Sequence, residues 1–99
     1  MQPLGDVLGR VLEDLGLKRG LLGWQAVETW SRTVGPRVAS HTRAVGFRDG
    51  TLQVEVDGSA WMHELGFLKR ELIRKINGAL GSDEVRDVRF TILRGGNQR

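Results

Sequence analysis

The two histidines are the side chains of this sequence best suited to metal binding or proton transfer, and neither lies in a catalytic motif. His63 and Glu64 begin like the zinc-binding HExxH motif, but Phe67 stands where its second histidine belongs. His41 is too distant in sequence to supply a short-spaced second ligand. Ser59, in a Gly-Ser-Ala-Trp segment, is interpreted as a helix N-cap rather than as a nucleophile. We therefore predict no catalytic residue and no metal ligand.

Other sequence motifs of enzymes are missing as well. The chain contains no cysteine, which excludes disulfides, thiolate metal sites and a cysteine nucleophile. It has no Walker A loop, no GxSxG elbow and no GxGxxG fingerprint. A Ser/His/Asp triad is assembled in space rather than by sequence spacing, and nothing in the chain argues for one. We predict a binding or adaptor module that needs no cofactor, and not an enzyme.

Size and composition favour the same class of protein. The chain has 99 residues, of which 39% are hydrophobic and 27% charged, as in a soluble globular domain. No apolar run approaches the roughly 20 residues that span a bilayer, and the N-terminus lacks the pattern of a signal peptide. We expect a single domain over residues 1–94, a flexible tail over residues 95–99, no membrane partner and a cytoplasmic location.

Basic residues are concentrated in three segments of the chain. The formal net charge is +3, from 15 Lys and Arg against 12 Asp and Glu. Residues 30–48 contain four arginines and no acidic residue, and further basic residues gather at 69–75 and 86–99. Arginine suits bidentate phosphate contacts and stacking on bases. The charge pattern by itself fits a phosphate-binding surface and a slightly basic solvated surface equally well.

The first half of the chain carries two helical patterns. Apolar residues recur at helical spacing over residues 3–15, which predicts an amphipathic helix that ends at Gly16. A second stripe predicts a helix that ends before Pro36, because proline disfavours helical backbone in the preceding residue. The members of this stripe are Leu21, Leu22, Ala26, Val27, Trp30 and Val34.

A β-hairpin is predicted after the second helix. Residues 43–48 have the composition of a strand, and Asp49-Gly50 is a hairpin-turn signal. Residues 52–56 alternate between apolar and polar side chains. This alternation predicts a strand with one buried face and one solvated face.

A long helix and a last strand complete the pattern. Ser59 is suited to cap a helix that runs to about Leu80 and stops at Gly81. The apolar stripe of this helix consists of Trp61, Leu65, Leu68, Leu72, Ile76 and Leu80. Alternation over residues 88–92 predicts the third strand.

The predicted order α-α-β-β-α-β indicates an α+β domain with a three-stranded sheet and helices packed on one face. If the third strand pairs in parallel beside the first, its crossover should be right-handed. The other face of the sheet is then left open. This layout resembles the K-homology-like domains, which include both nucleic-acid binders and protein adaptors.

One short motif has to be weighed against that resemblance. In K-homology domains a GxxG loop grips backbone phosphates, and Gly20-Leu21-Leu22-Gly23 fits this pattern. Its two central residues are apolar, whereas a phosphate-gripping loop needs exposed and often basic ones. We interpret the segment as the start of the second helix.

The tryptophans have different expected positions. Trp30 and Trp61 lie on the apolar stripes and are predicted to pack in the core. Trp61 belongs to the first turn of its helix, so its indole is expected to reach the surface. Trp24 lies off the main stripe of its helix and is expected to be partly exposed.

Phe67 does not follow the pattern of the third helix. At 100° per residue it points nearly opposite the apolar stripe, on one face with Arg70 and Arg74. An aromatic residue beside arginines suits a protein contact or a base-stacking platform. The alternative is that Phe67 packs against the helix at 3–15.

The series of residues from Trp30 to the last strand resembles the DciA family of bacterial proteins, long catalogued as a domain of unknown function. The residues that carry the resemblance are Trp30, Val34-Gly35, His41, Asp49-Gly50, Leu52, Val54, Val56, Ser59-Ala60-Trp61, Glu64-Leu65, Phe67-Leu68, Glu71-Leu72, Ile76-Asn77 and Val88-Arg89-Phe90. The helix at 3–15 is a looser match. Because the series is long and ordered, chance agreement is a poor explanation.

The resemblance implies a K-homology-like fold similar to the N-terminal domain of the initiator DnaA. It implies an adaptor that binds the hexameric DnaB-type replicative helicase and promotes its loading onto single-stranded DNA at the start of replication. Members of the family act without an ATPase domain, in agreement with the missing Walker motif. Many carry a basic disordered extension that helps to bind DNA. This chain has only a short tail after Leu93, so we expect weak DNA binding by the chain alone.

Two groups of residues form the contact surfaces under this hypothesis. The helicase is expected to contact the outer face of the third helix and the region of its first turn, through Trp61, Phe67, Arg70 and Arg74. Single-stranded DNA is expected to follow arginine side chains, through Arg37, Arg43, Arg48 and Arg89. The sequence leaves the oligomeric state open.

A second function fits the same fold and charge. The protein would be a K-homology-type RNA-binding protein associated with the ribosome. This function requires the segment Gly20–Gly23 to be an exposed loop that contacts the RNA backbone. A third class, a small hydrolase, has no feature in its favour.

Overall fold

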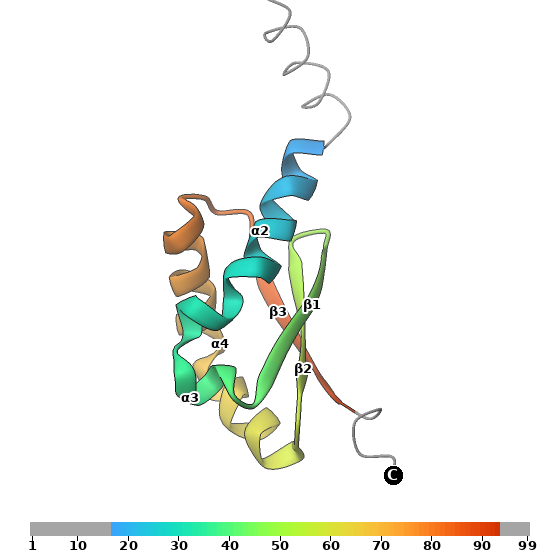
Figure 1. The fold of residues 1–99 in the computed structure, drawn as a ribbon, viewed down its shortest axis with the longest axis vertical. Helices are drawn as coiled ribbons and strands as arrows, with labels where there is room; N and C mark the ends of the chain where they lie inside the picture. Colours follow the sequence, from blue (N-terminus) through green and yellow to red (C-terminus); the bar gives the residue numbers. More distant parts are fainter. Residues whose placement is uncertain (1–16, 94–99) are drawn as a thin grey trace, which may run out of the picture.

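The computed structural model describes residues 17–93, which form a layer of helices against a three-stranded sheet (Figure 1). In chain order the elements are α2 (Leu17–Val34), α3 (Pro36–Ala39), β1 (Thr42–Arg48), β2 (Thr51–Val56), α4 (Ser59–Leu80) and β3 (Asp87–Ile92). The predicted α+β class is confirmed. The helix predicted at 3–15 and the tail predicted at 95–99 lie outside the described residues. The sequence did not predict α3, because four residues are too few to show a helical period.

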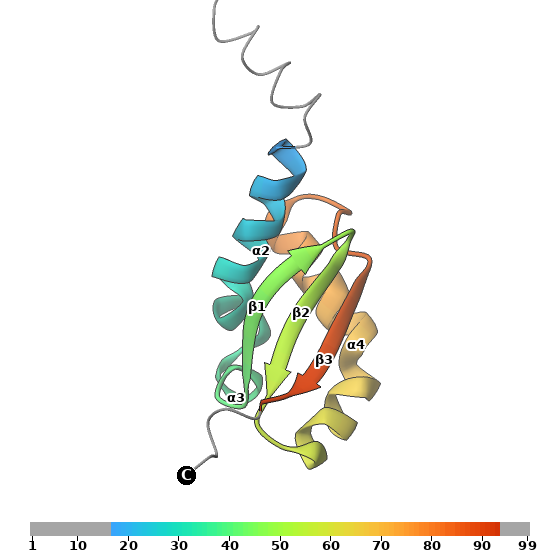
Figure 2. The ribbon, with the colours of Figure 1, turned by 90° about the vertical axis from the view of Figure 1, so that its right-hand side faces the viewer.

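The three strands form one sheet in the order β1-β2-β3, with β2 in the centre. β1 and β2 are antiparallel, and β3 runs parallel to β2 (Figure 2). The third strand therefore pairs with the second strand, and the pairing beside the first strand that we considered is wrong. The helices explain the difference: α2 packs against β1, whereas α4 packs against β3 and returns the chain to the free edge of β2. One helix joining adjacent parallel strands is the usual βαβ connection.

The β1–β2 hairpin closes through a tight turn. Asp49 and Gly50 have positive φ angles of 51° and 81°, as a type I′ turn requires. The guanidinium group of Arg86 lies over this turn, and its Nη2 donates a hydrogen bond to the carbonyl oxygen of Asp49 at 3.2 Å. The carbonyl oxygen of Gly50 accepts hydrogen bonds from the backbone N–H groups of Arg86 (2.8 Å) and Asp87 (3.2 Å). The predicted turn is confirmed, and it also anchors the start of β3.

One hydrophobic core lies between the helices and the sheet. Its buried side chains are Ala26, Trp30, Val34, Val38, Leu52, Val54, Val56, Leu65, Leu72, Ile76, Val85 and Val88. Along β2 the buried residues alternate with half-buried ones, which confirms the predicted one-sided strand. Burial of a large apolar side chain stabilises a fold by about 1.5–3 kcal/mol, so this core is the main source of stability.

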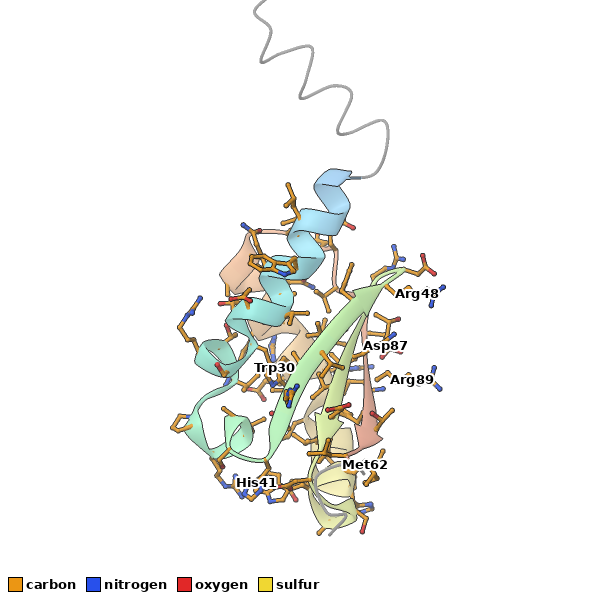
Figure 3. All side chains as sticks on the ribbon, turned by 45° about the vertical axis from the view of Figure 1, so that its right-hand side comes forward. Trp30, His41, Arg48, Met62, Asp87 and Arg89 are labelled. Atoms are coloured by element: carbon orange, nitrogen blue, oxygen red, sulfur yellow. The ribbon has the colours of Figure 1, made fainter. Side chains whose placement is uncertain are left out.

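Trp30 connects three elements of the core. Its side chain is 1% exposed and lies between α2 and the sheet (Figure 3). The indole Nε1 donates a hydrogen bond to Oγ1 of Thr42 at 2.9 Å, and that hydroxyl donates to the carbonyl oxygen of Val38 at 2.8 Å. These bonds join α2, β1 and α3 and satisfy the buried indole N–H. The predicted core position of Trp30 is confirmed.

The two ends of α4 differ in how well the sequence predicts them. Gly58 is the N-cap and Ser59 is already helical, with no side-chain capping bond. The predicted capping role of Ser59 is wrong, because the N–H of Met62 donates to the carbonyl oxygen of Gly58 at 3.0 Å and includes Ser59 in the first turn. At the other end Gly81 adopts the left-handed conformation, with φ 66°, and stops the helix as predicted.

Asn77 holds the connection between α4 and β3. Its Nδ2 donates to the carbonyl oxygen of Val85 at 2.8 Å, and its Oδ1 accepts from the N–H of Val85 at 3.1 Å. Val85 is buried, so one side chain satisfies two backbone groups in a segment without regular structure. Such groups are costly to leave unpaired. Asn77 therefore fixes the path of the chain into β3.

Candidate partner and nucleic-acid interfaces

The sheet has one covered face and one open face. Both long helices lie on the same side of it, and the opposite side faces the viewer in Figure 2. The strand register decides which side chains belong to the open face, because directly paired residues point the same way. On β2 the residues Thr51, Gln53 and Glu55 alternate with buried apolar ones and therefore occupy the open face.

The open face carries three of the four arginines predicted to contact nucleic acid. Arg43 pairs with Glu55, and Arg48 pairs with Thr51 across the hairpin. Arg89 on β3 pairs with Gln53. All three arginines are exposed, and Figure 3 shows Arg48 and Arg89 projecting on the same side of the sheet. The fold thus brings together cations from two distant segments of the sequence.

Acidic side chains dilute this positive surface. Glu55 and Asp87 share the open face with the arginines. Asp87 forms an ion pair with Lys69 of α4, with 3.2 Å between Oδ1 and Nζ. Because Lys69 balances Asp87, the three arginines are left opposite the single carboxylate of Glu55. The open face therefore has a modest positive balance, the kind of surface that attracts an anionic backbone at low salt.

Arg37 lies apart from the other arginines. Its guanidinium carbon is 5.2 Å from the centroid of the Trp61 ring, in a cation–π arrangement. His41 stacks on the same indole, with ring centroids 4.3 Å apart, and its Nδ1 lies 3.0 Å from Oδ2 of Asp57. A shallow depression of about 230 Å³ is bordered by Arg37, Trp61 and Glu64. This cluster joins α3, the turn that precedes β1 and the start of α4.

The predicted partner-binding residues fall into two groups. Phe67 is 78% exposed on α4, and Arg70 and Arg74 are exposed on the same face of the helix. The ring of His63 meets that of Phe67 edge-on, with centroids 5.1 Å apart. Trp61 does not join this group. It is half-buried and held by the cluster described above, which confirms that its indole reaches the surface.

The GxxG segment is not a loop. Gly20 and Gly23 both lie within α2. A Cβ atom at Gly23 would lie 2.2 Å from the ring of Phe47, so Gly23 is the position where α2 packs closely on β1. Leu21 is 58% exposed, so its predicted place on the core stripe is wrong, and Trp24 is exposed as expected at 62%. The loop that RNA binding through this segment would need is absent from α2.

The sequence missed a groove between α4 and β3. The depression has a volume of about 490 Å³ and is bordered by Met62, Gly66, Lys69, Arg89 and Phe90. No sequence signal could have found it, because the groove depends on which strand lies at the edge of the sheet. The pairing of His41 with Asp57 was missed as well. Their positions on either side of the hairpin were the available signal.

The described residues contain neither a membrane-spanning helix nor a cluster of metal ligands. Within residues 17–93 no helix is both long enough and apolar enough to cross a membrane. In the same range no three His, Asp or Glu side chains are grouped so that they could hold a metal ion.

The fold and these surfaces define a class of protein: a small α+β domain with an open sheet face and an exposed aromatic residue beside arginines on its longest described helix. The particular family follows from comparison with known sequences. The family model described as "Dna[CI] antecedent, DciA" matches residues 3–90. The chain belongs to the DciA family, and the predicted resemblance is confirmed.

Curated relatives agree with this assignment. The chain is 35% identical over 88 residues to a UPF0232 protein of Mycolicibacterium paratuberculosis, which covers 85% of this chain and 49% of the relative. It is 34% identical over 88 residues to a UPF0232 protein of Mycobacterium marinum and 33% identical to one of Mycobacterium tuberculosis, each covering 85% of this chain and 47% of the relative. The chain thus spans about half the length of the curated relatives it matches.

Proposed function

We propose that this protein is a non-enzymatic, cytoplasmic adaptor that binds a DnaB-type replicative helicase and assists its loading onto single-stranded DNA at replication initiation. Membership of the DciA family supports a role of this type. The observation that carries the proposal is Phe67, a large apolar side chain that is 78% exposed. Burial of such a side chain against a partner protein would remove its contact with water and stabilise the complex.

The surroundings of Phe67 support a protein partner. Aromatic residues and arginine are enriched at the centres of protein interfaces. Phe67, Arg70 and Arg74 follow one another at the spacing of a single helix face. The rigid helix presents them together, so binding requires little ordering of the backbone. The outer face of α4 is therefore the proposed helicase contact, with Trp61 as a separate contact at its first turn.

We expect Phe67→Ala and Arg70→Ala each to weaken binding of the helicase by about tenfold to thirtyfold, the usual effect of removing an interface anchor. The measurement is analytical sedimentation of this protein with the replicative helicase of its own organism. Trp24→Ala is the matched control, because Trp24 is also a largely exposed aromatic residue but lies on α2. Circular dichroism checks that each variant is folded.

Two sedimentation results would contradict the proposed helicase contact. Unchanged sedimentation of the Phe67→Ala variant, together with loss of the complex in Trp24→Ala, would move the interface to α2. The absence of any complex at micromolar concentration, both with and without single-stranded DNA, would remove the helicase role itself.

We further propose that single-stranded DNA binds weakly to the open face of the sheet. Replacing Arg43, Arg48 and Arg89 together with alanine is expected to reduce the slope of log K against log salt by about 0.7 for each lost phosphate contact. The measurement is fluorescence anisotropy of labelled oligo-dT over a series of salt concentrations. Arg37→Ala is tested separately, because Arg37 lies on Trp61 and not on this face.

The control for this measurement is Arg32→Ala, since Arg32 is an exposed arginine of α2 bonded to Thr29. It should leave the salt slope unchanged. An unchanged slope in the triple variant would show that DNA does not follow the open face.

A further inference from the structure

β3 is an edge strand with free backbone groups. The backbone N–H and C=O groups of its odd-numbered residues point toward β2. Two hydrogen bonds show this: the N–H of Asp87 donates to the carbonyl oxygen of Gly50 (3.2 Å), and the N–H of Leu93 donates to the carbonyl oxygen of Val56 (2.7 Å). In a parallel ladder the intervening residues point the other way. The N–H and C=O groups of Phe90 and Ile92 therefore face outward. In the part of the chain that the structure describes, no strand pairs with this edge.

One end of this edge is already protected. Oδ1 of Asp87 accepts a hydrogen bond from the N–H of Val88 at 2.9 Å, and the same oxygen pairs with Nζ of Lys69. Acidic and basic side chains at an edge are a usual way to prevent unwanted strand pairing. The protection ends at Val88, because no described side chain accepts a hydrogen bond from the outward N–H groups of Phe90 and Ile92. The open part of the edge is short and has a defined start.

The groove described above runs along the edge from Asp87 to Phe90, so it begins at the protected end and reaches the open part at Phe90. On its helix side Met62 and Phe90 provide apolar surface. Gly66 leaves room between them, because a Cβ atom there would meet no other atom within 4 Å. Ile92, which is 36% exposed, continues the apolar surface along β3. The lining of the groove is mixed: Met62, Val88 and Phe90 are apolar, whereas Thr51, Lys69, Asp87 and Arg89 are polar. An apolar side chain of a segment that lies along the strand would contact the first three.

The open-face side of the edge is polar, and Arg89 is its one cation that is not balanced by a carboxylate among the described residues. Arg89 belongs to the open face of the sheet, and the ammonium group of Lys69 reaches Asp87 at the edge. Arg89 makes no ion pair among the described residues. A segment that pairs with β3 would place alternate side chains on the two sides of the edge. Acidic side chains would lie near Arg89, and apolar ones would lie in the groove.

We propose that the free edge of β3 binds an extended peptide of a partner protein by strand addition, and that the preferred peptide alternates apolar and acidic residues. Strand addition uses main-chain hydrogen bonds for affinity and alternate side-chain positions for specificity. Nucleic acid lacks the repeating N–H and C=O groups that match the outward groups of Phe90 and Ile92. This surface is separate from the outer face of α4 and from the proposed helicase contact.

The test uses the full chain labelled with ¹⁵N and the acetylated heptapeptide of alternating Glu and Val, with Glu at both ends. Amide signals of Phe90 and Ile92 are expected to shift and to become protected from hydrogen exchange when the peptide is added. Two N-methylated forms of the peptide, one for each set of alternate amides, provide the matched controls. One form should lose binding by about tenfold or more, as expected for lost hydrogen bonds, and the other should bind like the parent.

A pair of protein variants separates the backbone from the side chain. Ile92→Pro removes the outward N–H, and proline is tolerated at an edge where the N–H faces solvent. It should reduce binding by about tenfold, whereas Ile92→Ala, which keeps the N–H, should reduce it less. Phe67→Ala should leave peptide binding unchanged, which keeps this result independent of the helicase experiment.

Three results would overturn the proposal. The first is equal binding of both N-methylated peptides and the parent, because it would show that no backbone ladder forms. The second is a set of shifts on Phe67 and Arg70 in place of Phe90 and Ile92. The third is displacement of the peptide by oligo-dT with larger shifts at the same two amides, which would assign the edge to nucleic acid.

Discussion

Trp30→Ala is expected to lower the free energy of unfolding by about 3–5 kcal/mol, the usual cost of replacing a buried aromatic residue by alanine. The indole is 1% exposed and lies between α2 and the sheet. Its removal leaves a large cavity and also leaves the hydroxyl of Thr42 without its donor. A domain of this size has about 5–15 kcal/mol of stability in total, so the variant should unfold at a much lower urea concentration than the parent protein.

Urea denaturation followed by circular dichroism measures this effect. Trp24→Ala is the control, because it removes the same side chain from a position that is 62% exposed, where surface substitutions change stability by about 0.5 kcal/mol or less. Trp30→Phe separates the two causes, since it keeps most of the volume and loses the hydrogen bond to Thr42. Equal stability of the Trp30→Ala and Trp24→Ala variants would contradict the core position.

Asn77→Ala is expected to reduce the free energy of unfolding by about 2–4 kcal/mol, because each buried backbone group left unpaired costs about 1–3 kcal/mol. Two groups are affected, since Asn77 bonds to both the N–H and the carbonyl of Val85. No other side chain among the described residues bonds to either group. The substitution should also loosen the segment that leads into β3.

The measurement for Asn77 combines urea denaturation with hydrogen exchange. Lys75→Ala is a suitable control, because Lys75 is exposed on the same helix two residues earlier and should change stability very little. The amide of Val85 should exchange faster in Asn77→Ala than in the control. A stability loss without faster exchange at Val85 would show that Asn77 acts in some other way.

Local sequence patterns predicted most of the secondary structure. Helical spacing predicted α2 and α4, strand composition predicted β1, and alternation predicted β2 and β3. Asp49-Gly50 and Gly81 were predicted correctly because positive φ angles are required by the turn and the helix end themselves. These features depend on residues that are close together in sequence. The predicted capping role of Ser59 was wrong, because Gly58 takes the N-cap position and the helix begins one residue earlier than expected.

The arrangement of the surfaces could not be predicted in the same way. Strand order is a long-range property, and it decides that Arg89 lies on the same face as Arg43 and Arg48. Arg37 belongs to the same basic stretch of sequence, yet α3 turns it onto Trp61. Clustering along the chain therefore identified three members of the arginine surface and one residue of a different site. Phe67 was predicted on the outer face from helical angle alone, and its exposure confirms that position.

The Gly50 carbonyl has a further consequence for how the sequence can vary. It accepts hydrogen bonds from the N–H groups of both Arg86 and Asp87. The hairpin turn, and not the end of α4, therefore fixes the register of β3 against β2. Because Asn77 separately holds Val85, the residues between Ser82 and Val85 are bounded by two fixed points. An insertion there would enlarge a surface loop without sliding β3, whereas a deletion at the hairpin tip would move the reference point itself. Length changes in related chains should be tolerated after Gly81 and excluded at Asp49-Gly50.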